Sequence, residues 1–377
     1  MICAGGTGGG VYPALAVLEQ LKVSGFKVGG TGVKGNPLNY EPSGLELLWV
    51  GGEDGMEEGL VKRTGIPFQT IPAAGLHGIG LRALPRNLVT LVRGVRASTK
   101  ILREFKPDVL FFTGGYVAGP MAFAGRKVPT LLYVPDIEPG LALKSLVRFA
   151  DVVTVTAPDS QKYFSKNVII TGYPIRTGLS TWDKQRAYSE LNLNADRPVL
   201  LIFGGSKGAH SINEAAISNL PALLEFTQIV HISGSLDWET VQTAHTGLTS
   251  VQKSQYHIFP YLHDEMGAAL ASADLVISRA GASTLGEFPY FGLPAILVPY
   301  PHAWRYQKVN ADYLAERGAA VIVKDETLKR DLLTVIRDLL ANPFKRKTMS
   351  QAMKSLSHPE AAQDIAGQIM LLGGHRL

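Results

Sequence analysis

Two glycine-rich turns in the sequence have the composition of anion-binding loops. The first is the run 5–10 (GGTGGG), and the second is the run 204–208 (GGSKG). Glycines let backbone N–H groups approach an anion closely, and the N-terminus of a following helix favours negative charge. In the second turn Ser206 adds a hydroxyl donor and Lys207 a positive charge, but the spacing is not that of a P-loop. Ordinary tight turns also use glycine, and that alternative stays open for each turn taken alone.

The residues 278–287 (SRAGASTLGE) form the densest group of candidate ligand contacts. They follow a short apolar run, and ligands of open α/β sheets bind where the strands end. Gly281, Ser283 and Thr284 would open a helix and offer amide donors to a diphosphate. Glu287, one turn into that helix, could accept hydrogen bonds from both hydroxyls of a ribose. The structural alternative is that Ser283 or Thr284 caps the helix and Glu287 closes a capping box; the spacing leaves both interpretations open.

Further polar side chains occur near the ends of other apolar runs. Gln307 and Asn310 lie three residues apart on one face of a predicted helix start, and neutral amides suit sugar hydroxyls. A histidine such as His302 is more often structural than catalytic. Arg176 could clamp a phosphate through two hydrogen bonds, although a surface ion pair is the commoner role of an arginine. No Asp-x-Asp tripeptide occurs, so an acid pair for a metal-bridged diphosphate has no candidate and we expect no metal or other cofactor.

The elements that must position these residues are short apolar runs alternating with helical patterns. Their continuous apolar character, without alternation, is typical of strands buried on both faces of a parallel sheet. Helical segments, such as Tyr12–Leu21, Ile212–Leu224 and Val309–Arg317, lie between them, which indicates βαβ units. The candidate strands are Ile2–Ala4, Leu47–Val50, Val109–Phe112, Thr130–Val134, Val152–Val155, Val199–Phe203, Ile229–Ile232, Leu275–Ile277, Ala295–Val298 and Ala320–Val323.

The strand, glycine turn and helix pattern occurs twice, about 200 residues apart. We therefore predict an α/β protein with two Rossmann-like, doubly wound parallel-sheet domains that face each other across a cleft. The predicted boundaries are an N-terminal domain over 1–171, a linker over 172–198 and a C-terminal domain over 199–377, whose last helix could cross back to the first domain. The Gly-, Pro- and Asn-rich stretch 29–44 is predicted to be a surface insertion.

Composition narrows the class of protein. The single cysteine excludes an intrachain disulfide, and we predict no spanning segment because no run of 18 apolar residues occurs. The formal charge of +5 suits an anionic ligand or membrane surface, or is incidental. Nucleic acid is not expected as a partner, because the basic residues are scattered. The segment 76–96 interleaves apolar and basic residues, which is typical of an interfacial membrane patch or of an ordinary amphipathic helix that packs inward.

Over nearly the whole chain, these motifs resemble those of the MurG family of GT-B glycosyltransferases (family 28). The run 114–120 (GGYVAGP) is the most specific of them, because its composition has no generic explanation. The resemblance implies an inverting hexosyltransferase that moves N-acetylglucosamine from UDP-GlcNAc to undecaprenyl-linked lipid I, forming lipid II in peptidoglycan synthesis. It also implies a peripheral protein at the cytoplasmic face of the cell membrane, with the segment 76–96 docking on the anionic membrane surface.

Carried over by position, the resemblance also implies a set of donor-binding residues. Leu262 would lie near the uracil, Glu287 would hold the ribose, and Gln307 would meet the hydroxyls of the sugar. The full set is Thr7, Gly8, Gly9, Asp136, Arg176, Ser206, Leu262, Ala282, Ser283, Thr284, Leu285, Gly286, Glu287 and Gln307.

Two departures from the family pattern concern acid–base chemistry. Gly10 stands where the family typically has a histidine, and 133–136 (YVPD) replaces a His-Glu-Gln-Asn segment. The hypothesis is that Asp136 or Glu138 deprotonates the attacking hydroxyl instead. The alternatives are another lipid-acceptor glycosyltransferase, a UDP-GlcNAc epimerase of the same fold, and a catalytically silent sugar-nucleotide-binding protein.

Overall fold

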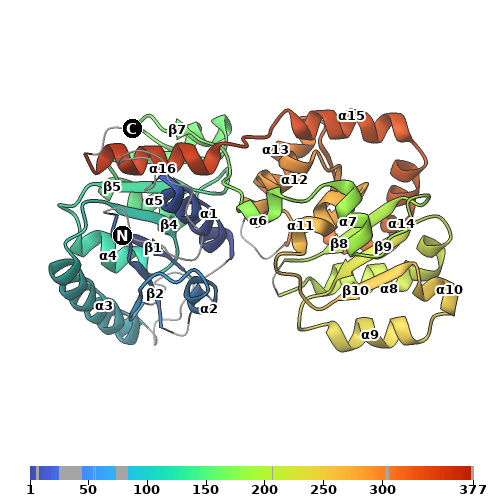
Figure 1. Cartoon of the computed structure of the whole chain (residues 1–377), viewed down its shortest axis with the longest axis horizontal. Helices are drawn as coiled ribbons and strands as arrows, with labels where there is room; N and C mark the ends of the chain where they lie inside the picture. Colours follow the sequence, from blue (N-terminus) through green and yellow to red (C-terminus); the bar gives the residue numbers. More distant parts are fainter. Residues whose placement is uncertain are drawn as a thin grey trace, which may run out of the picture. The chain divides into compact units, whose positions relative to one another are not determined.

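The computed structural model of the chain (Figure 1) describes residues 1–5, 8–24, 45–53, 55, 57–73, 84–205, 207–301 and 305–374. It divides into two compact units, each built around its own parallel sheet. The first unit comprises Met1–Pro135, Pro139–Arg176 and Glu360–Leu377. The second comprises Asp136–Glu138 and Thr177–Pro359.

Within its described residues the first unit contains a seven-stranded sheet in the order β3-β2-β1-β4-β5-β6-β7. Every pair of neighbours is parallel. The chain order reverses beside β1, with β2 on one side and β4 on the other, which makes this the position where such sheets bind ligands. The strands are β1 (Ile2–Ala4), β2 (Trp49–Gly52), β3 (Phe68–Ile71), β4 (Leu110–Gly114), β5 (Thr130–Val134), β6 (Val152–Val155) and β7 (Ile169–Ile170).

Helices cover both faces of this sheet. Successive strand residues point to opposite faces, so Phe111 packs with α1 and α16 on one face, while Phe112 packs with α3, α4 and α5 on the other. Figure 1 shows α16, near the end of the chain, beside α1. The helices are α1 (Gly8–Ser24), α2 (Glu57–Lys62), α3 (Leu84–Phe105), α4 (Ala118–Ala124), α5 (Leu141–Leu146) and α16 (Ala361–Leu372), with 3₁₀ turns η1 (Val147–Phe149) and η2 (Pro158–Tyr163).

The second unit repeats the plan with a parallel sheet of six described strands in the order β10-β9-β8-β11-β12-β13. Here the chain order reverses between β8 and β11. The strands are β8 (Val199–Phe203), β9 (Gln228–Ile232), β10 (Tyr256–Phe259), β11 (Leu275–Ser278), β12 (Ala295–Leu297) and β13 (Ala320–Ile322). The helices are α6 (Thr177–Ser180), α7 (Lys184–Glu190), α8 (His210–Leu224), α9 (Trp238–Thr246), α10 (Ser250–Lys253), α11 (Met266–Ser272), α12 (Glu287–Phe291), α13 (Tyr306–Glu316), α14 (Leu328–Leu340) and α15 (Pro343–Lys354), with η3 (Ala282–Leu285) and η4 (Asp325–Thr327).

The predicted fold class, two doubly wound parallel sheets, is confirmed, and each strand predicted from an apolar run is present to within two residues at either end. Three strands were not predicted: β3, β7 and β10. All three lie at the edge of a sheet, where one side of the strand stays open and polar residues such as Gln69 and His257 are tolerated. The stretch predicted as a linker contains α6 and α7, and the predicted insertion at 29–44 lies outside the described residues.

The packing of α16 on the first unit can be tested at Ile365. This side chain is fully buried in the core shared by α1 and the sheet. We expect Ile365→Ala to lower the free energy of unfolding by about 2–4 kcal/mol, measured by urea denaturation, because a buried cavity would result. Gln363→Ala, on the exposed side of the same helix, should change it by less than about 0.5 kcal/mol. Equal effects of the two variants would contradict the observed packing.

Candidate active site

The glycine turn after β8 presents backbone donors at the carboxyl edge of the second sheet. Helix α8 begins at His210, its N-cap Ala209 makes no side-chain cap, and its first turn holds no acidic residue. Gly205 has a positive φ of 93°, and a Cβ added there would meet nothing within 4 Å. Among the described residues, the turn is therefore open at Gly205, and the 15-residue helix α8 follows it; the N-terminus of such a helix is a favourable place for an anion. Ser206, predicted to contact the donor, lies outside the described residues.

The segment 278–287 follows β11, which pairs directly with β8. Gly281 also faces open space, and Ser283 is partly exposed, whereas the side chains of Ala282, Thr284 and Leu285 are buried. The Thr284 hydroxyl donates to the Gly281 carbonyl at 2.7 Å. Most of these side chains are thus buried, whereas Gly281 and Ser283 stay partly exposed.

The predicted helix in this segment differs from the observed one. A 3₁₀ turn comes first, and Glu287 is the first residue of α12 rather than one turn into a helix. The N-caps of η3 and α12 are Gly281 and Gly286, and neither makes a side-chain cap, so the capping-box interpretation is wrong. Glu287 is 8% exposed.

Arg279 joins the loops that surround this edge. Its guanidinium donates to the Val298 carbonyl at the end of β12 and forms an ion pair with Asp325, which follows β13. It also donates to the Ser211 hydroxyl on α8 at 2.8 Å, and Ser211 in turn donates to Asp325 at 2.7 Å. The Arg279 side chain, for which the sequence predicted no role, thus ties three other chain segments to its own.

Helix α13 contributes two amide side chains, as predicted, but they differ in environment. Gln307 is partly exposed, and its Oε1 accepts from the backbone N–H of Tyr300 at 2.9 Å, which leaves its NH₂ group oriented as a donor. Asn310 is fully buried. Its Oδ1 accepts from the N–H of Ile137 at 3.0 Å, and its Nδ2 donates to Asp136 at 2.8 Å and to the Ala280 carbonyl at 3.1 Å.

Asn310 therefore holds Asp136 next to the segment 278–287 of the same unit. Burial raises the pKa of Asp136 to about 6, against the opposing effect of the hydrogen bond from Asn310. Glu138, two residues on, is paired with Arg305 at 2.8 Å. The two carboxylates proposed for acid–base chemistry thus have different environments, and the pKa of Asp136 lies close to neutral pH.

The remaining predicted site residues lie on other elements. Leu262 is buried in the loop after β10 in the second unit. In the first unit, Gly8 and Gly9 open α1, and Thr7 lies outside the described residues. Arg176 stacks over the ring of Tyr12 with its Cζ 4.5 Å from the centroid. The Arg176 Nε finds no hydrogen-bond partner among the residues that the structure describes, so this arginine could take an anionic one.

Gly10 packs closely against β4. The Thr113 hydroxyl donates to the Gly10 carbonyl at 2.6 Å, and a Cβ added at Gly10 would lie 3.3 Å from the Thr113 carbonyl oxygen. A larger residue at this position would require β4 to give by a few tenths of an ångström. This close contact is consistent with the absence of the family's usual histidine.

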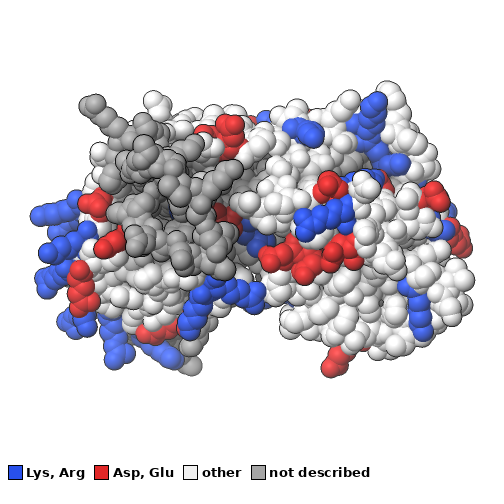
Figure 2. Space-filling view, viewed as in Figure 1, with Lys and Arg blue, Asp and Glu red and all other residues white. Residues whose placement is uncertain are grey.

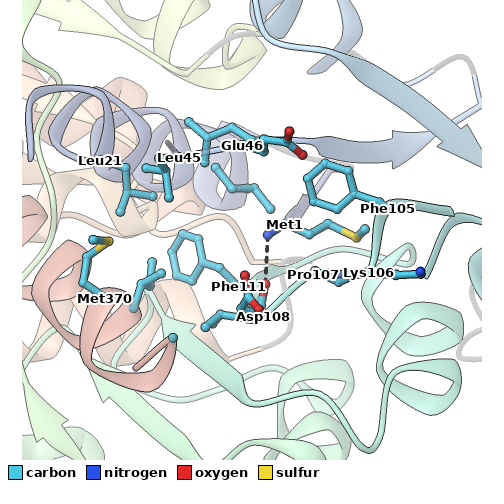
Figure 3. A pocket seen from close by; sticks show the side chains of 15 residues that line it. Met1, Leu21, Leu45, Glu46, Phe105, Lys106, Pro107, Asp108, Phe111 and Met370 are labelled. Carbon is cyan, nitrogen blue, oxygen red and sulfur yellow. Dashed lines mark hydrogen bonds between the residues drawn. The ribbon is translucent and has the colours of Figure 1, made fainter. Parts of the chain in front are cut away.

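A cavity of about 260 Å³ in the first unit lies away from these residues (Figure 3). It lies at the amino-terminal ends of β1 and β4, the edge opposite the glycine turns. Phe105, Phe111 and Met370 line it, and the Met1 amine donates to the Val109 carbonyl at 2.8 Å beside it. The cavity is therefore separate from the candidate site residues, which lie at the carboxyl ends of the strands.

In the described part of the chain, no three His, Cys, Asp or Glu side chains gather in a way that could hold a metal ion. None of the helices in those ranges is long and apolar enough to cross a membrane.

Comparison with known proteins identifies the class. Residues 1–155 match the glycosyltransferase family 28 N-terminal domain, and residues 199–365 match the family's C-terminal domain. The chain belongs to glycosyltransferase family 28, and it is a hexosyltransferase with the GT-B fold.

Two relatives of this chain have the same name. A UDP-N-acetylglucosamine–N-acetylmuramyl-(pentapeptide) pyrophosphoryl-undecaprenol N-acetylglucosamine transferase of Desulforamulus reducens is 39% identical, over 97% of this chain and 96% of the relative. The transferase of the same name from a Roseiflexus species is 38% identical, over 97% and 93%. Among solved structures, MurG of Acinetobacter baumannii is 29% identical with a TM-score of 0.72, and the match covers 98% of both chains.

The raised pKa of Asp136 predicts a pH-dependent effect on stability. The folded chain keeps this proton up to about pH 6, whereas the unfolded chain loses it near pH 4. The stability gained from the protonated form is therefore present below pH 4 and lost as the pH rises through 6. We expect Asp136→Asn to stabilise the protein by ~1 kcal/mol at pH 8 and to leave it unchanged at pH 4.

Thermal unfolding at the two pH values measures this difference. Asp338→Asn, an exposed carboxylate on α14, serves as the control and should show no such dependence. If Asp136→Asn changes the stability of the protein by the same amount at both pH values, the raised pKa of Asp136 is contradicted.

Proposed function

We propose that this hexosyltransferase moves N-acetylglucosamine from UDP-GlcNAc to the muramyl sugar of lipid I and forms lipid II. The observation that carries the proposal is the convergence of three features at the edge between β8 and β11. These are the open glycine turn, the uncapped N-terminus of α8 and the segment 278–287. The names of relatives 38–39% identical over almost the full chain support the choice of donor and acceptor.

In this proposal the second unit binds the donor. The diphosphate lies at the turn 204–208 and the start of α8, where backbone N–H groups and Ser206 can donate to it. The uracil lies near Leu262, the ribose hydroxyls at Glu287, and the NH₂ group of Gln307 donates to a sugar hydroxyl. The segment 282–286 (ASTLG) supplies backbone contacts.

The first unit binds the acceptor in this proposal. Its own glycine turn, with Thr7, Gly8 and Gly9, lies at the point where the strand order of that sheet reverses. Arg176 would add a cation for the phosphates of a bound substrate. The domain roles are accordingly acceptor and membrane binding for residues 1–171 and UDP-sugar binding for 199–377, with 172–198 joining them.

The reaction is a direct displacement with inversion. The acceptor hydroxyl attacks C1 of N-acetylglucosamine, the bond from C1 to the diphosphate oxygen breaks, and UDP leaves with the bonding electrons. Asp136 accepts the proton of the attacking hydroxyl. Its position beside the Ala280 carbonyl, through the shared contact with Asn310, supports this role. Glu138 would hold Arg305 in place rather than take the proton.

Product analysis tests the function. The purified chain is incubated with labelled UDP-GlcNAc and a lipid I analogue, with and without a chelator. A lipid-linked disaccharide is expected in both cases. Release of an isomerised sugar nucleotide without acceptor would instead favour an epimerase. UDP-GlcNAc binding with no product would favour a different acceptor or a silent binding protein.

The role of Asp136 predicts the pH dependence of turnover. A base must be deprotonated to accept a proton, so kcat/KM should rise about tenfold per pH unit below pH 6 and level off above it. Asp136→Asn should lower kcat at least ~100-fold at pH 8. Glu138→Gln, which alters the ion pair with Arg305, serves as the comparison and should change kcat far less. Full turnover in both variants would exclude a carboxylate base at this loop.

We further propose that helix α3 docks on an anionic membrane at the cytoplasmic face of the cell. Leu88, Val89 and Val92 are 54%, 57% and 46% exposed, and Arg93 and Arg96 are exposed on the same helix. Figure 2 shows Lys and Arg side chains gathered over the part of the first unit where α3 lies in Figure 1. Apolar side chains flanked by cations suit insertion among anionic headgroups.

Vesicle binding tests this surface. Val89→Glu should weaken co-sedimentation with phosphatidylglycerol vesicles at least about tenfold, because it removes an apolar contact and adds repulsion. Phe344→Glu provides the matched control, since Phe344 on α15 is 81% exposed but has no part in the proposed surface. Equal losses in the two variants, or no loss in Val89→Glu, would contradict docking through α3.

A further inference from the structure

The glycine turn after β8 packs backbone against backbone on the segment that follows β9. A Cβ added to Gly208 would lie 2.1 Å from the Ser233 carbonyl oxygen, and one added to Gly234 would lie 2.3 Å from the Gly208 nitrogen. Both glycines have positive φ, 84° and 77°. No side chain fits between them. The positions of the N–H groups in the turn therefore depend on where the segment 233–237 lies.

Asn213, in the first turn of α8, holds that segment. Its Nδ2 donates to the Ser233 carbonyl at 2.8 Å and to the Asp237 carboxylate at 2.8 Å. The Ser233 carbonyl is the same one against which Gly208 packs. Asn213 is 1% exposed, so water could not replace these bonds, and their loss would leave buried polar groups unpaired.

His231 and Tyr256 orient the Asn213 amide. Because Nδ2 of Asn213 makes both donor bonds, the Oδ1 of Asn213 must be an acceptor. His231 Nε2 therefore carries a hydrogen and donates it to this Oδ1, and the two atoms are 2.9 Å apart. His231 Nδ1 then accepts from the Tyr256 hydroxyl at 2.7 Å. Burial lowers the pKa of His231 to about 4, so the ring stays neutral at physiological pH. The hydrogen bonds run in one direction, from Tyr256 to Asp237.

We propose that Asn213 is a positioning residue for the diphosphate of the nucleotide donor. It contacts the segment 233–237 and not the ligand, and it acts by holding the backbone of the turn 204–208 in place. This inference rests on the proposed donor role of that turn. Hydrogen bonds to a phosphate are charge-assisted and sensitive to geometry, so a displaced turn loses affinity for the diphosphate. The proposed contacts for uracil and ribose lie on other elements and keep their places: Leu262 follows β10, and Glu287 begins α12.

Titration calorimetry with UDP and with uridine tests the inference, because the two ligands differ only in the diphosphate. Asn213→Asp cannot donate to the Ser233 carbonyl and sets a second carboxylate against Asp237. We expect UDP to bind about tenfold more weakly, as for the loss of a hydrogen bond to a charged group, and uridine affinity to stay within about twofold. Asn219→Asp is the matched control on the same helix, since the Asn219 amide bonds to the carbonyls of Ala215 and Lys329; it should change neither affinity.

A second variant tests the direction of the hydrogen bond. Adding Asp237→Asn to Asn213→Asp lets the amide at 237 donate to the carboxylate at 213 and removes the charge repulsion, so part of the roughly tenfold loss of UDP affinity should be recovered. UDP affinity should stay about threefold below that of the unaltered protein, because the Ser233 carbonyl still lacks its donor. If the single variant does not fold, this pair is measured in its place, and a loss confined to UDP is expected.

The possible failures are distinguishable. Equal losses for UDP and uridine in a folded variant, or unchanged UDP affinity in Asn213→Asp, would overturn the positioning role. If the unaltered protein binds UDP no more tightly than uridine, the donor site at the turn 204–208 is wrong, and the inference falls with it.

Discussion

The loops at the carboxyl edge of each sheet approach so closely that backbone lies on backbone. In the first unit a Cβ added to Gly115 would lie 2.3 Å from the Gly5 carbonyl oxygen, and in the second unit Gly208 and Gly234 meet in the same way. These contacts occur beside β1 and β8, where the strand order reverses. The close approach keeps side chains away from the starts of α1 and α8. The N–H groups there can then face a ligand, and the glycine content of both turns follows from that requirement.

Backbone contacts of this kind limit where the loops can lie, and side-chain hydrogen bonds hold the loops in their observed positions. In the second unit three buried or half-buried groups do this: Asn213 for the turn after β8, Arg279 for the loops after β11, β12 and β13, and Asn310 for Asp136 and Ala280. In each case one side chain bonds to at least two separate segments. Such networks are strong only when every member has a partner, and the amides of Asn213 and Asn310 use both their donor and acceptor atoms.

The acid–base chemistry of this chain depends on burial as much as on residue type. Gly10 supplies no side chain, and its tight contact with Thr113 leaves little space for one. Asp136, the proposed base, is buried, and desolvation raises its pKa to about 6 while Asn310 keeps the carboxylate oriented. Glu138 has the same chemical group but a guanidinium partner. Two carboxylates two residues apart thus have different surroundings.

The sequence by itself determined the fold class, the buried strands and the places of the two glycine-rich turns. Each depends on local composition: continuous apolar runs mark strands covered on both faces, and glycines mark turns that need positive φ or close approach. Only the tertiary structure decided the edge strands β3, β7 and β10, because β3 and β10 contain polar residues and β7 has only two residues, Ile169 and Ile170. It also decided that Glu287 begins α12, that burial raises the pKa of Asp136, and that Asn213 and Arg279 hold the loops together. These outcomes depend on contacts between residues that are far apart in the sequence and come together at the edge of a sheet. Local sequence patterns carry no information about such contacts.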